Sequence, residues 1–463
     1  MSDIVIVDSG VANLASIASA LRRLGATVTV TADADEVLRS ARVVLPGVGA
    51  FGAGLAALHG HGLGAAIAAA AARGTPLLGI CLGMQMLCEA SEEAPGVPGL
   101  GIIPGTCRRL PDHVRVPHLG WNYVAVDPAA SCLTSGVAAF ANSYALPQAP
   151  SEWIAAWSTH GERFVAALER SRIVACQFHP ELSGRYGAAL LERWLVGAGA
   201  TTAEPPRPDA TTPGLRRRLV PCLDVRDGRV VKGVRFQWLR DAGDPAERAA
   251  CYEAQGADEI VVLDVAASPE GRDTQVETVT QVRAAISIPL TVGGGVRSVA
   301  DARRLLAAGA DKISVNTAAV RRPALLAELA AAFGRQCVVL AIDARRVDDR
   351  WEVLALSGRE RALPDAVTWA QWGEQVGAGE ILLTSWDRDG TRAGPDLELL
   401  RAVCRAVRLP VVASGGIGSR EHVAQAFGAG ADAVLAASVF HDGDETVAGI
   451  KADLAVRGIP VRQ

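Results

Sequence analysis

Cys81 stands between two glycines in the segment GICLGMQ, residues 79–85, which follows the apolar run PLL and leads into a helix-forming segment. A sharp turn between a strand and a helix lifts the central side chain out of the strand, and the N-terminus of the following helix favours the thiolate. A structural cysteine does not need this setting. The pattern therefore predicts that Cys81 is a nucleophile.

A nucleophilic cysteine needs a base, and the motif QFHPE, which ends at Glu181, offers one. Pro180 favours an extended conformation at the residue before it, His179. We expect His179 to take the thiol proton of Cys81. Glu181 is then expected to fix the imidazole tautomer and to stabilise the imidazolium.

The motif LPGVG, residues 45–49, lies at the end of another apolar segment. Its glycines, Gly47 and Gly49, leave backbone N–H groups free to form an oxyanion hole. Around these motifs apolar strands such as DIVIVD and PLLGIC alternate with helical segments such as NLASIASALRRLG, which predicts a mostly parallel sheet covered on both faces. Later segments such as WNYVAV and ERFVAALER are more typical of antiparallel strands and hairpins.

The second half of the chain contains an internal repeat of four motifs in the same order. LDVRDGRVVKG is echoed by AIDARRVDDRWEV, LDVAAS by LTSWDRDG, VGGGVRS by SGGIGS, and AGADKISVNTAAV by AGADAVLAASVF. The motifs are separated by a nearly constant offset of about 120 residues, since Asp224 is matched by Asp343 and Gly294 by Gly415. Two half-barrels of four strand–helix units each explain this repeat.

Residues 197–214 are rich in Pro, Thr and Ala and show no apolar periodicity, as is typical of a linker. The linker divides the chain into residues 1–196 and residues 215–463, and the second segment has the usual length of a (β/α)8 barrel. We therefore predict an α/β protein of two domains. The first domain is a doubly covered sheet, and the second is a (β/α)8 TIM barrel made of two half-barrel repeats.

Glycine pairs after strands allow a phosphate to approach the backbone closely. The repeat supplies two such sites, and two related phosphate sites predict a long ligand with a phosphate at each end. The residues predicted to hold it are Gly294, Gly295 and Asn316 in one half and Ser414, Gly415, Gly416 and Ser438 in the other.

Asp224 and Asp343 end equivalent strands of the two halves, so both are expected at the mouth of the barrel between the phosphate sites. Two carboxylates there suit general acid and base catalysis on a bound sugar. Further side chains expected in this cavity are Lys232, Asp264, Thr384 and Asp387, and the loop SWDRDGT adds Asp389 and Gly390.

Four charged residues, Arg218, Glu259, Lys312 and Glu380, each precede an apolar strand of the second half and are expected at the opposite, N-terminal end of the barrel. We call these four residues the charged ring. Two positive and two negative charges around one rim can pair with one another. The alternative is that they only solvate this end of the barrel.

The composition excludes several classes of function. A net charge of −4 argues against a nucleic-acid partner. The nine cysteines form no CxxC pair, so we expect no metal site, no disulfide framework and a reducing, cytoplasmic location. The N-terminus lacks the basic region of a signal peptide, and no apolar run reaches the ~20 residues of a membrane span. No fingerprint of a nucleotide cofactor is evident.

Residues 1–196 resemble the class I glutamine amidotransferase family, in which a Cys-His-Glu triad hydrolyses glutamine to glutamate and ammonia through a thioester. The resemblance implies that Cys81, His179 and Glu181 form the triad. It also implies that Gly47, Gly49, Gln85 and Ser143 contribute to glutamine binding and to the oxyanion hole. The motif PHLGWN resembles the glutaminases of the imidazole glycerol phosphate synthase family, which commonly have histidine where Asn142 stands.

Residues 215–463 resemble the cyclase barrels of the same synthase family of histidine biosynthesis. The resemblance implies that Asp224 and Asp343 are the acid/base pair, that Lys232 helps to hold the substrate, and that the charged ring gates an ammonia tunnel. The implied substrates are glutamine and the bisphosphate ribulosyl formimino aminoimidazole carboxamide ribonucleotide. The implied products are imidazole glycerol phosphate and aminoimidazole carboxamide ribonucleotide, with the glutaminase docked on the cyclase within one chain.

Two other interpretations remain open at this point. The sister isomerase of the same pathway shares the half-barrel repeat, so the chain could join a glutaminase to an isomerase barrel, although LLTSWDRDGT and KISVNTAAV fit the cyclase better. The chain could instead be a regulatory binding protein with a degenerate glutaminase. The intact triad argues against that second interpretation.

Overall fold

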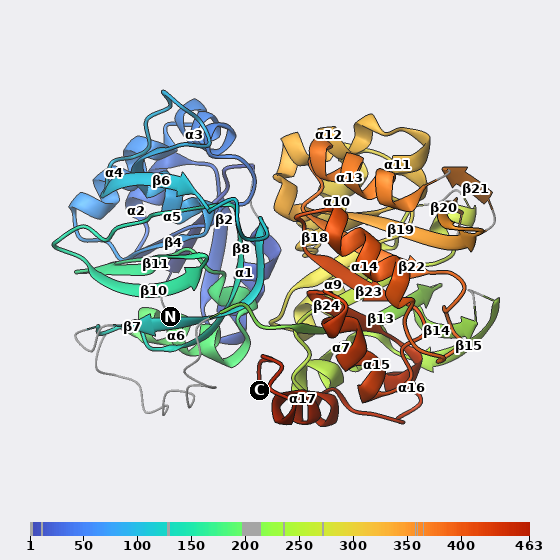
Figure 1. Ribbon diagram of the computed structural model, residues 1–463. Coiled ribbons are helices and arrows are strands. Elements are labelled where there is room, and N and C mark those ends of the chain that lie inside the picture. The colour runs from blue at the N-terminus through green and yellow to red at the C-terminus, as the bar shows by residue number, and fades with distance from the viewer. Residues whose placement is uncertain are drawn as a thin grey trace. The chain divides into compact units, whose positions relative to one another are not determined.

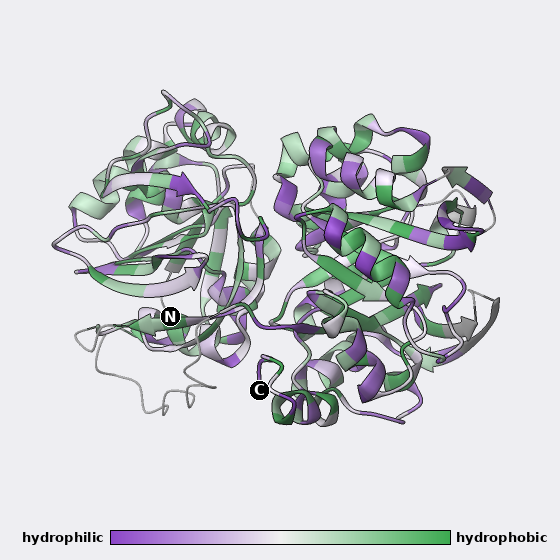
Figure 2. Ribbon diagram, in the orientation of Figure 1, coloured by the Kyte–Doolittle hydropathy of each residue, from purple (hydrophilic) through white to green (hydrophobic). Residues whose placement is uncertain are grey.

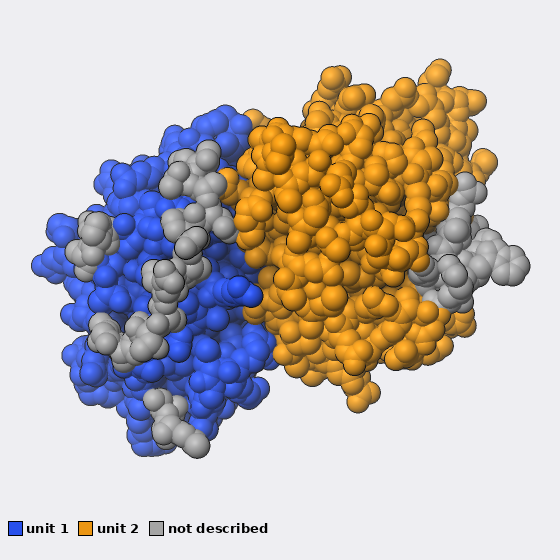
Figure 3. All heavy atoms as spheres, turned by 90° about the horizontal axis from the view of Figure 1, so that it is seen from below, with its two compact units in different colours: residues 1–215 blue, residues 216–463 orange. Residues whose placement is uncertain are grey.

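The computed structural model describes residues 3–10, 13–126, 130–196, 214–234, 237–270, 273–356, 358, 360–363 and 365–463. The chain divides into two compact units, residues 1–215 and residues 216–463 (Figure 3). The predicted linker falls almost entirely outside the described residues, which resume at Gly214.

The first unit contains a mixed sheet and a small second sheet (Figure 1). Its strands are β1 (Asp3–Val7), β2 (Thr27–Thr31), β3 (Arg42–Leu45), β4 (Leu77–Ile80), β5 (Cys88–Ser91), β6 (Ile103–Arg109), β7 (His118–Val126), β8 (Gly136–Asn142), β9 (Tyr144–Ala145), β10 (Ile154–His160), β11 (Glu162–Arg170) and β12 (Ile173–Cys176). Its helices are α1 (Leu14–Arg23), α2 (Ala34–Arg39), α3 (Phe51–Gly60), α4 (Leu63–Ala72), α5 (Leu82–Leu87), the 3-10 turn η1 (Pro180–Leu182) and α6 (Gly184–Val196).

The large sheet has the strand order β2-β1-β3-β4-β12-β11-β10-β7-β8 within the described residues. The first five strands in this order are parallel, and the last four are added antiparallel. Both halves of this arrangement were expected from the sequence. The sheet is buried on both sides, because Ile4 and Ile6 belong to one hydrophobic core while Val5 and Val7 of the same strand belong to another.

The second unit is a closed barrel with helices around it. Its strands are β13 (Arg218–Arg226), β14 (Arg229–Val234), β15 (Gln237–Gly243), β16 (Ile260–Asp264), β17 (Leu290–Gly293), β18 (Lys312–Val315), β19 (Val338–Val347), β20 (Arg350–Ala355), β21 (Glu360–Leu363), β22 (Glu380–Ser385), β23 (Val411–Ser414) and β24 (Ala433–Ala436). Its helices are α7 (Pro245–Ala254), α8 (Ala267–Glu270), α9 (Val276–Ala285), α10 (Val299–Ala307), α11 (Thr317–Arg321), α12 (Ala324–Phe333), the 3-10 turn η2 (Arg335–Cys337), α13 (Ala366–Val376), α14 (Leu397–Ala406), α15 (Arg420–Gly428), α16 (Ser438–His441) and α17 (Val447–Val456).

Eight parallel strands, β13-β16-β17-β18-β19-β22-β23-β24, close on themselves because β24 pairs with β13. The predicted (β/α)8 barrel is therefore confirmed. The repeat extends beyond the motifs that revealed it: β13 continues into the antiparallel strands β14 and β15, and β19 continues in the same way into β20 and β21.

The interior of the barrel is layered, as the alternation of side chains along each strand requires. An apolar cluster fills its middle, formed by Val220, Cys222, Val261, Val339, Leu382, Val412, Ala433 and Leu435, with Leu263, Ala341 and Ala437 beside it. Figure 2 shows these strands as largely hydrophobic, whereas the surrounding helices carry hydrophilic segments. The functional residues of the barrel therefore lie at its two ends, above and below this apolar layer.

Within the part of the chain that the structure describes, no single helix is long and apolar enough to cross a membrane. Helices α3 and α4 reach that length only as a pair, and the two meet at a bend of 87°.

Candidate active sites

Cys81 lies in the sharp turn between β4 and α5, buried and with a backbone of φ 52° and ψ −110°. A non-glycine residue rarely adopts a positive φ, so this conformation is held by the surrounding packing. A Cβ atom at Gly83 would lie 1.9 Å from the carbonyl oxygen of Leu45, and one at Gly79 would lie 3.3 Å from the backbone of Met84. The two glycines that flank Cys81 therefore allow the chain to turn this closely.

The predicted oxyanion segment lies beside this turn. A Cβ atom at Gly47 would lie 2.9 Å from Cβ of Leu82 and 3.0 Å from the backbone nitrogen of Gly83, the two residues that follow Cys81. Gly49 has a φ of 101°, which favours glycine. The loop after β3 and the start of α5 thus bring backbone groups of both segments close to the cysteine.

His179 and Glu181 follow β12 and are both buried. Nδ1 of His179 lies 2.8 Å from Oε1 of Glu181. Burial opposes a charged imidazole, but the charges of Cys81 and Glu181 and the hydrogen bonds to both raise the pKa of His179 well above its usual value. The arrangement therefore favours an imidazolium beside Cys81, and a cation beside a cysteine activates it as a nucleophile.

The residues predicted to bind glutamine come together around the same point. The amide of Gln85, on α5, donates to the carbonyl oxygen of Tyr144 at 3.0 Å. The buried hydroxyl of Ser143 has no hydrogen-bond partner among the described residues, so it is available to a ligand. Asn142 lies opposite His118 in the β7–β8 pairing and donates to the carbonyl of Tyr144 at 3.0 Å.

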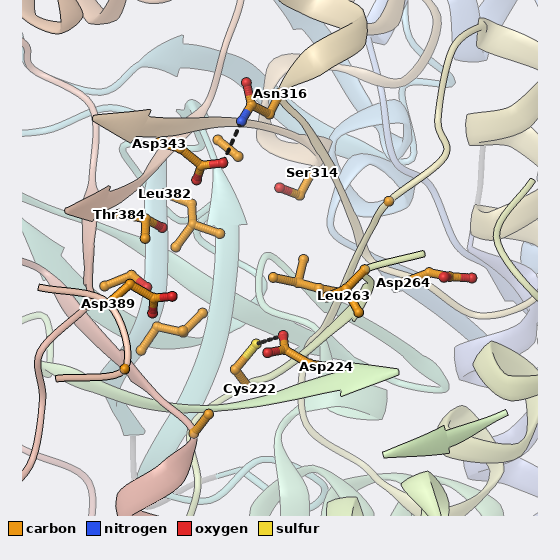
Figure 4. A pocket seen from close by; sticks show the side chains of 18 of the residues that line it. Cys222, Asp224, Leu263, Asp264, Ser314, Asn316, Asp343, Leu382, Thr384 and Asp389 are labelled. Carbon is orange, nitrogen blue, oxygen red and sulfur yellow. Dashed lines mark hydrogen bonds between the residues drawn. The ribbon is translucent and has the colours of Figure 1, made fainter. Parts of the chain in front are cut away.

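At the C-terminal ends of its strands the barrel holds a cavity that gathers most of the residues predicted to bind substrate (Figure 4). The predicted residues that line it are Asp224, Asp264, Gly294, Gly295, Asn316, Asp343, Thr384, Asp389, Gly390, Ser414, Gly415, Gly416 and Ser438. Lys232 belongs to β14, and its side chain is outside the described part of the structure.

Asp224 and Asp343 point into this cavity from opposite halves of the barrel (Figure 4). Asp224 lies 3.4 Å from the thiol of Cys222, and Asp343 accepts a hydrogen bond of 2.9 Å from the amide of Asn316. Burial, reinforced by the negative charge of Asp389, raises the pKa of each carboxyl to about 7. Near neutral pH either carboxyl can therefore give or take a proton.

The two glycine pairs have the same backbone in both halves. Gly294 and Gly415 both have a φ of 94°, and Gly295 and Gly416 have values of 69° and 81°. A Cβ atom at Gly294 would lie 2.2 Å from the carbonyl of Asp264, and one at Gly415 would lie 2.7 Å from that of Ser385. These turns are tight enough to require glycine, and they bring the backbone to the wall of the cavity.

Two predicted side chains, one at the cavity wall and one outside it, accept hydrogen bonds from the backbone. The carboxylate of Asp264 accepts from the backbone N–H groups of Ala266 and Ala267 at 3.3 and 3.0 Å, and Figure 4 shows it pointing away from Asp224 and Asp343. The carboxylate of Asp387 accepts from the backbone N–H of Arg346 at 2.8 Å. Asp387 is not among the residues that line the cavity.

Four cavity residues with a hydroxyl, thiol or charged side chain were missed by the sequence analysis: Cys222, Ser314, Thr317 and Arg392. Thr317 is the first residue of α11 as Ser438 is the first residue of α16, so the repeat offset could have found it. Arg392 has a positive φ of 58° and pairs with Asp442 and with Asp444, the latter at 2.7 Å. No motif in the sequence indicated Arg392.

At the other end of the barrel the charged ring is buried and closed. Arg218 pairs with Glu259 at 2.8 Å and with Glu380, and Lys312 pairs with Glu259 at 2.7 Å and with Glu380. Thr291 donates to Glu259 at 2.6 Å. Burial would raise the pKa of Glu380, but Arg218 and Lys312 lower it to about 2, so the carboxylate is ionised at neutral pH.

Comparison with known proteins assigns the two units to two families. Residues 5–198 match the model of the family described as glutamine amidotransferase class-I, and residues 218–446 match that described as histidine biosynthesis protein. Similar proteins include the imidazole glycerol phosphate synthase subunit HisF of Mycobacterium tuberculosis strains ATCC 25177 / H37Ra and CDC 1551 / Oshkosh. Each is 58% identical over 256 residues, which cover 54% of this chain and 96% of the relative.

Proposed function

The chain belongs to the histidine biosynthesis family of imidazole glycerol phosphate synthase barrels and carries a class-I glutamine amidotransferase unit before it; on that premise we propose that it is a fused synthase whose first unit makes ammonia for its second. Fusion raises the effective concentration of one unit for the other, so even a weak interface between them would suffice. We assign the reaction to the cytoplasm, where the nine scattered cysteines stay reduced.

In the first unit, the thiolate of Cys81 attacks the carboxamide carbon of glutamine. Backbone N–H groups of the segment containing Gly47 and Gly49 stabilise the oxyanion. His179 gives its proton to the departing ammonia, and a thioester forms. His179 then takes a proton from water, which hydrolyses the thioester to glutamate. Glu181 holds His179 in the required tautomer throughout.

In the barrel, the two glycine pairs hold the two phosphates of the ribulosyl formimino nucleotide. Ammonia attacks the carbonyl carbon of the sugar chain, whose oxygen leaves as water. The bound nitrogen then attacks the formimino carbon, and the C–N bond to the aminoimidazole carboxamide ribonucleotide breaks as the ring closes; these steps need protons to be removed and delivered. Asp224 and Asp343 supply a base and an acid, since a pKa of about 7 allows each to be present in either form. The products are imidazole glycerol phosphate and aminoimidazole carboxamide ribonucleotide.

Ammonia that escaped into water at neutral pH would mostly become ammonium, which is not a nucleophile. We therefore propose that ammonia passes through the charged ring and along the apolar interior of the barrel. In the closed ring every charge is paired, so passage requires at least one pair to separate.

The observation that carries the proposal is the pair of carboxyls with raised pKa between two equivalent glycine turns, in a chain that also contains a buried Cys-His-Glu cluster. The test measures glutamate release from glutamine, with and without the bisphosphate nucleotide, together with the imidazole product. We expect ligand-dependent hydrolysis and close to one product per glutamate.

Two variants make the test specific to each site. Cys81→Ala should lose glutamine-dependent synthesis but keep synthesis from an ammonium salt, whereas Asp343→Asn should lose both. An isomerase barrel would convert its substrate without consuming ammonium, and a degenerate glutaminase would release no glutamate. Either result would refute the proposed function.

A further inference from the structure

Gln177, the first residue of the QFHPE motif, has no role in the mechanism above but touches its reacting atom. The residue follows β12 and is fully buried, and its backbone N–H donates to the carbonyl of Ala166 at 2.8 Å. Its side-chain Nε2 donates to Sγ of Cys81 at 3.6 Å. A buried amide therefore directs an N–H group at the sulfur from the same segment that carries the histidine.

The orientation of this amide is fixed by a second glutamine. Nε2 of Gln85 donates to the backbone carbonyl of Tyr144 and to Oε1 of Gln177, each at 3.0 Å. A backbone carbonyl can only accept, so Gln85 must present its NH2 group on this side. The oxygen of Gln177 is thereby occupied by Gln85, and its NH2 group is left facing Cys81.

The other groups that face Cys81 have different roles. The charge of Cys81 raises the pKa of His179, and Glu181 accepts from Nδ1 of His179 at 2.8 Å. The carbonyl oxygen of Ala141, on β8, lies 4.0 Å from Sγ and can accept only from the protonated thiol. Among these described neighbours, Gln177 is thus the uncharged donor to the sulfur, and a hydrogen bond to the charged form of a group favours that form.

We propose that Gln177 stabilises the thiolate of Cys81 and that Gln85 is a positioning residue that holds the Gln177 amide in the required orientation. The inference rests on the proposed function in one respect, that Cys81 is the nucleophile. This proposal gives Gln85 a second role beside glutamine binding. The NH2 group of Gln85 donates to protein acceptors, and its side-chain oxygen remains for the substrate.

The test follows alkylation of Cys81 by iodoacetamide as a function of pH in the full-length protein, with the modified peptide quantified by mass spectrometry. This readout needs no glutamine. The measured midpoint belongs to the coupled Cys81–His179 pair, so variants are compared with the wild type under identical conditions. We expect Gln177→Met, which keeps the size of the side chain but removes the N–H donor, to shift the midpoint upward by about one pH unit.

A double-variant cycle tests the positioning role. Gln85→Met should shift the midpoint in the same direction by a smaller amount, and the double variant should shift it no further than Gln177→Met alone, because Gln85 acts through Gln177. Gln371→Met is the matched control. Gln371 lies in the barrel, where it donates from an exposed position to the carbonyl of Ala406 at 3.5 Å, so its replacement should leave the midpoint unchanged.

Each outcome decides a separate point. An unchanged midpoint in a Gln177→Met protein with wild-type thermal unfolding would overturn the role of Gln177, and additive shifts would overturn that of Gln85. If Gln177→Met does not fold, Gln177→Glu retains the acceptor for Gln85 and places an acidic oxygen beside the sulfur, so its midpoint must rise. Glutamate release by the wild type tests the proposed function independently: no release together with the expected shifts would refute the function but not the contact.

Discussion

Asp224 and Asp343 occupy equivalent positions on β13 and β19, since Asp224 lies beside Leu263 of β16 as Asp343 lies beside Thr384 of β22. Each carboxyl is half-buried, and the pKa of each is raised to about 7. The hydrogen-bonding neighbour of Asp224 is Cys222 of the same half of the barrel, whereas that of Asp343 is Asn316 of the other half. A duplicated half-barrel has thus produced two proton-transfer groups of nearly equal strength that face one cavity.

The first prediction is that ionisation of Asp343 lowers the free energy of unfolding. Because the pKa of Asp343 is higher in the folded protein than in the unfolded chain, its ionised form is disfavoured in the fold. The resulting loss of stability is absent below about pH 4, grows as the pH rises, and is complete above about pH 7. Asp343→Asn keeps an oxygen to accept from Asn316 and should raise the unfolding midpoint more at pH 8 than at pH 5. The upper limit is about 4 kcal/mol.

Asp241→Asn is the control for this experiment. Asp241 is exposed, and the backbone N–H of Gly243 and the side chain of Arg229 lower the pKa of its carboxyl. Its contribution to stability is present at high pH and lost on acidification, so this replacement should have the opposite dependence on pH. A stabilisation by Asp343→Asn that is equal at pH 5 and pH 8 would contradict the prediction.

The second prediction concerns Asp389, whose charge contributes, after burial, to the raised pKa of both Asp224 and Asp343. In Asp389→Asn both values should fall. The pH profile of ammonium-dependent synthesis, corrected for the fraction of free ammonia, should therefore move to lower pH at both limbs. A lower rate with an unmoved profile would show that Asp389 binds substrate without tuning the pair.

The third prediction concerns the charged ring. Lys312→Met removes one of the two cations that pair with Glu259 and Glu380, and it should allow ammonia to be lost, so that glutamate is released in excess of the imidazole product. Breaking a buried pair on one side also costs about 3–5 kcal/mol. The measurement is the ratio of glutamate to product at saturating glutamine and nucleotide.

Lys451→Met separates the two effects of that replacement. Lys451 is also buried and pairs with Asp258 at 2.6 Å, but it lies on α17 outside the charged ring. It should destabilise the barrel by a comparable amount while keeping one product per glutamate. Equal yields of glutamate and product in Lys312→Met would count against the gate.

The fourth prediction concerns the turn that carries the nucleophile. A Cβ atom at Gly83 would overlap the carbonyl of Leu45, so Gly83→Ala must displace either α5 or the end of β3. Glutaminase activity should fall by at least about tenfold, since displacements of about 1 Å can cost far more than that. Synthesis from an ammonium salt should be unaffected. Gly60→Ala, at a position with open space, is the matched control and should leave both activities intact.

The sequence was sufficient to predict a mostly parallel sheet in the first unit, the (β/α)8 barrel, and the grouping of polar residues around Cys81 and Asp343. These features follow from apolar periodicity and from glycines that mark tight turns, both of which are local patterns. Asp264 shows where such patterns stop being informative: the end of its strand could be predicted, but not the choice of its carboxylate between the cavity and two nearby backbone N–H groups.

Gln177 shows a second limit. Its contact with Cys81 depends on which way round its amide lies, and this depends on Gln85 and on the carbonyl of Tyr144, which are distant from it in the chain. The charged ring at the other end of the barrel could be predicted because the sequence shows where the strands begin. That each of its cations contacts both of its anions follows only from the closure of the barrel.

The doubling of the barrel has a consequence for how a ligand is oriented. A site with an approximate twofold axis can bind either end of a molecule that carries a phosphate at both ends. The turns at Gly294 and Gly415 therefore cannot alone determine the orientation in which the molecule binds. Direction must come from places where the halves have diverged. Asn316 lines the cavity in one half, and the equivalent residue of the other half is Ala437. Cys222 likewise lines the cavity, and its equivalent in the other half is Ala341. These two pairs of unlike residues, rather than the two equivalent phosphate sites, would determine the orientation of the bound substrate.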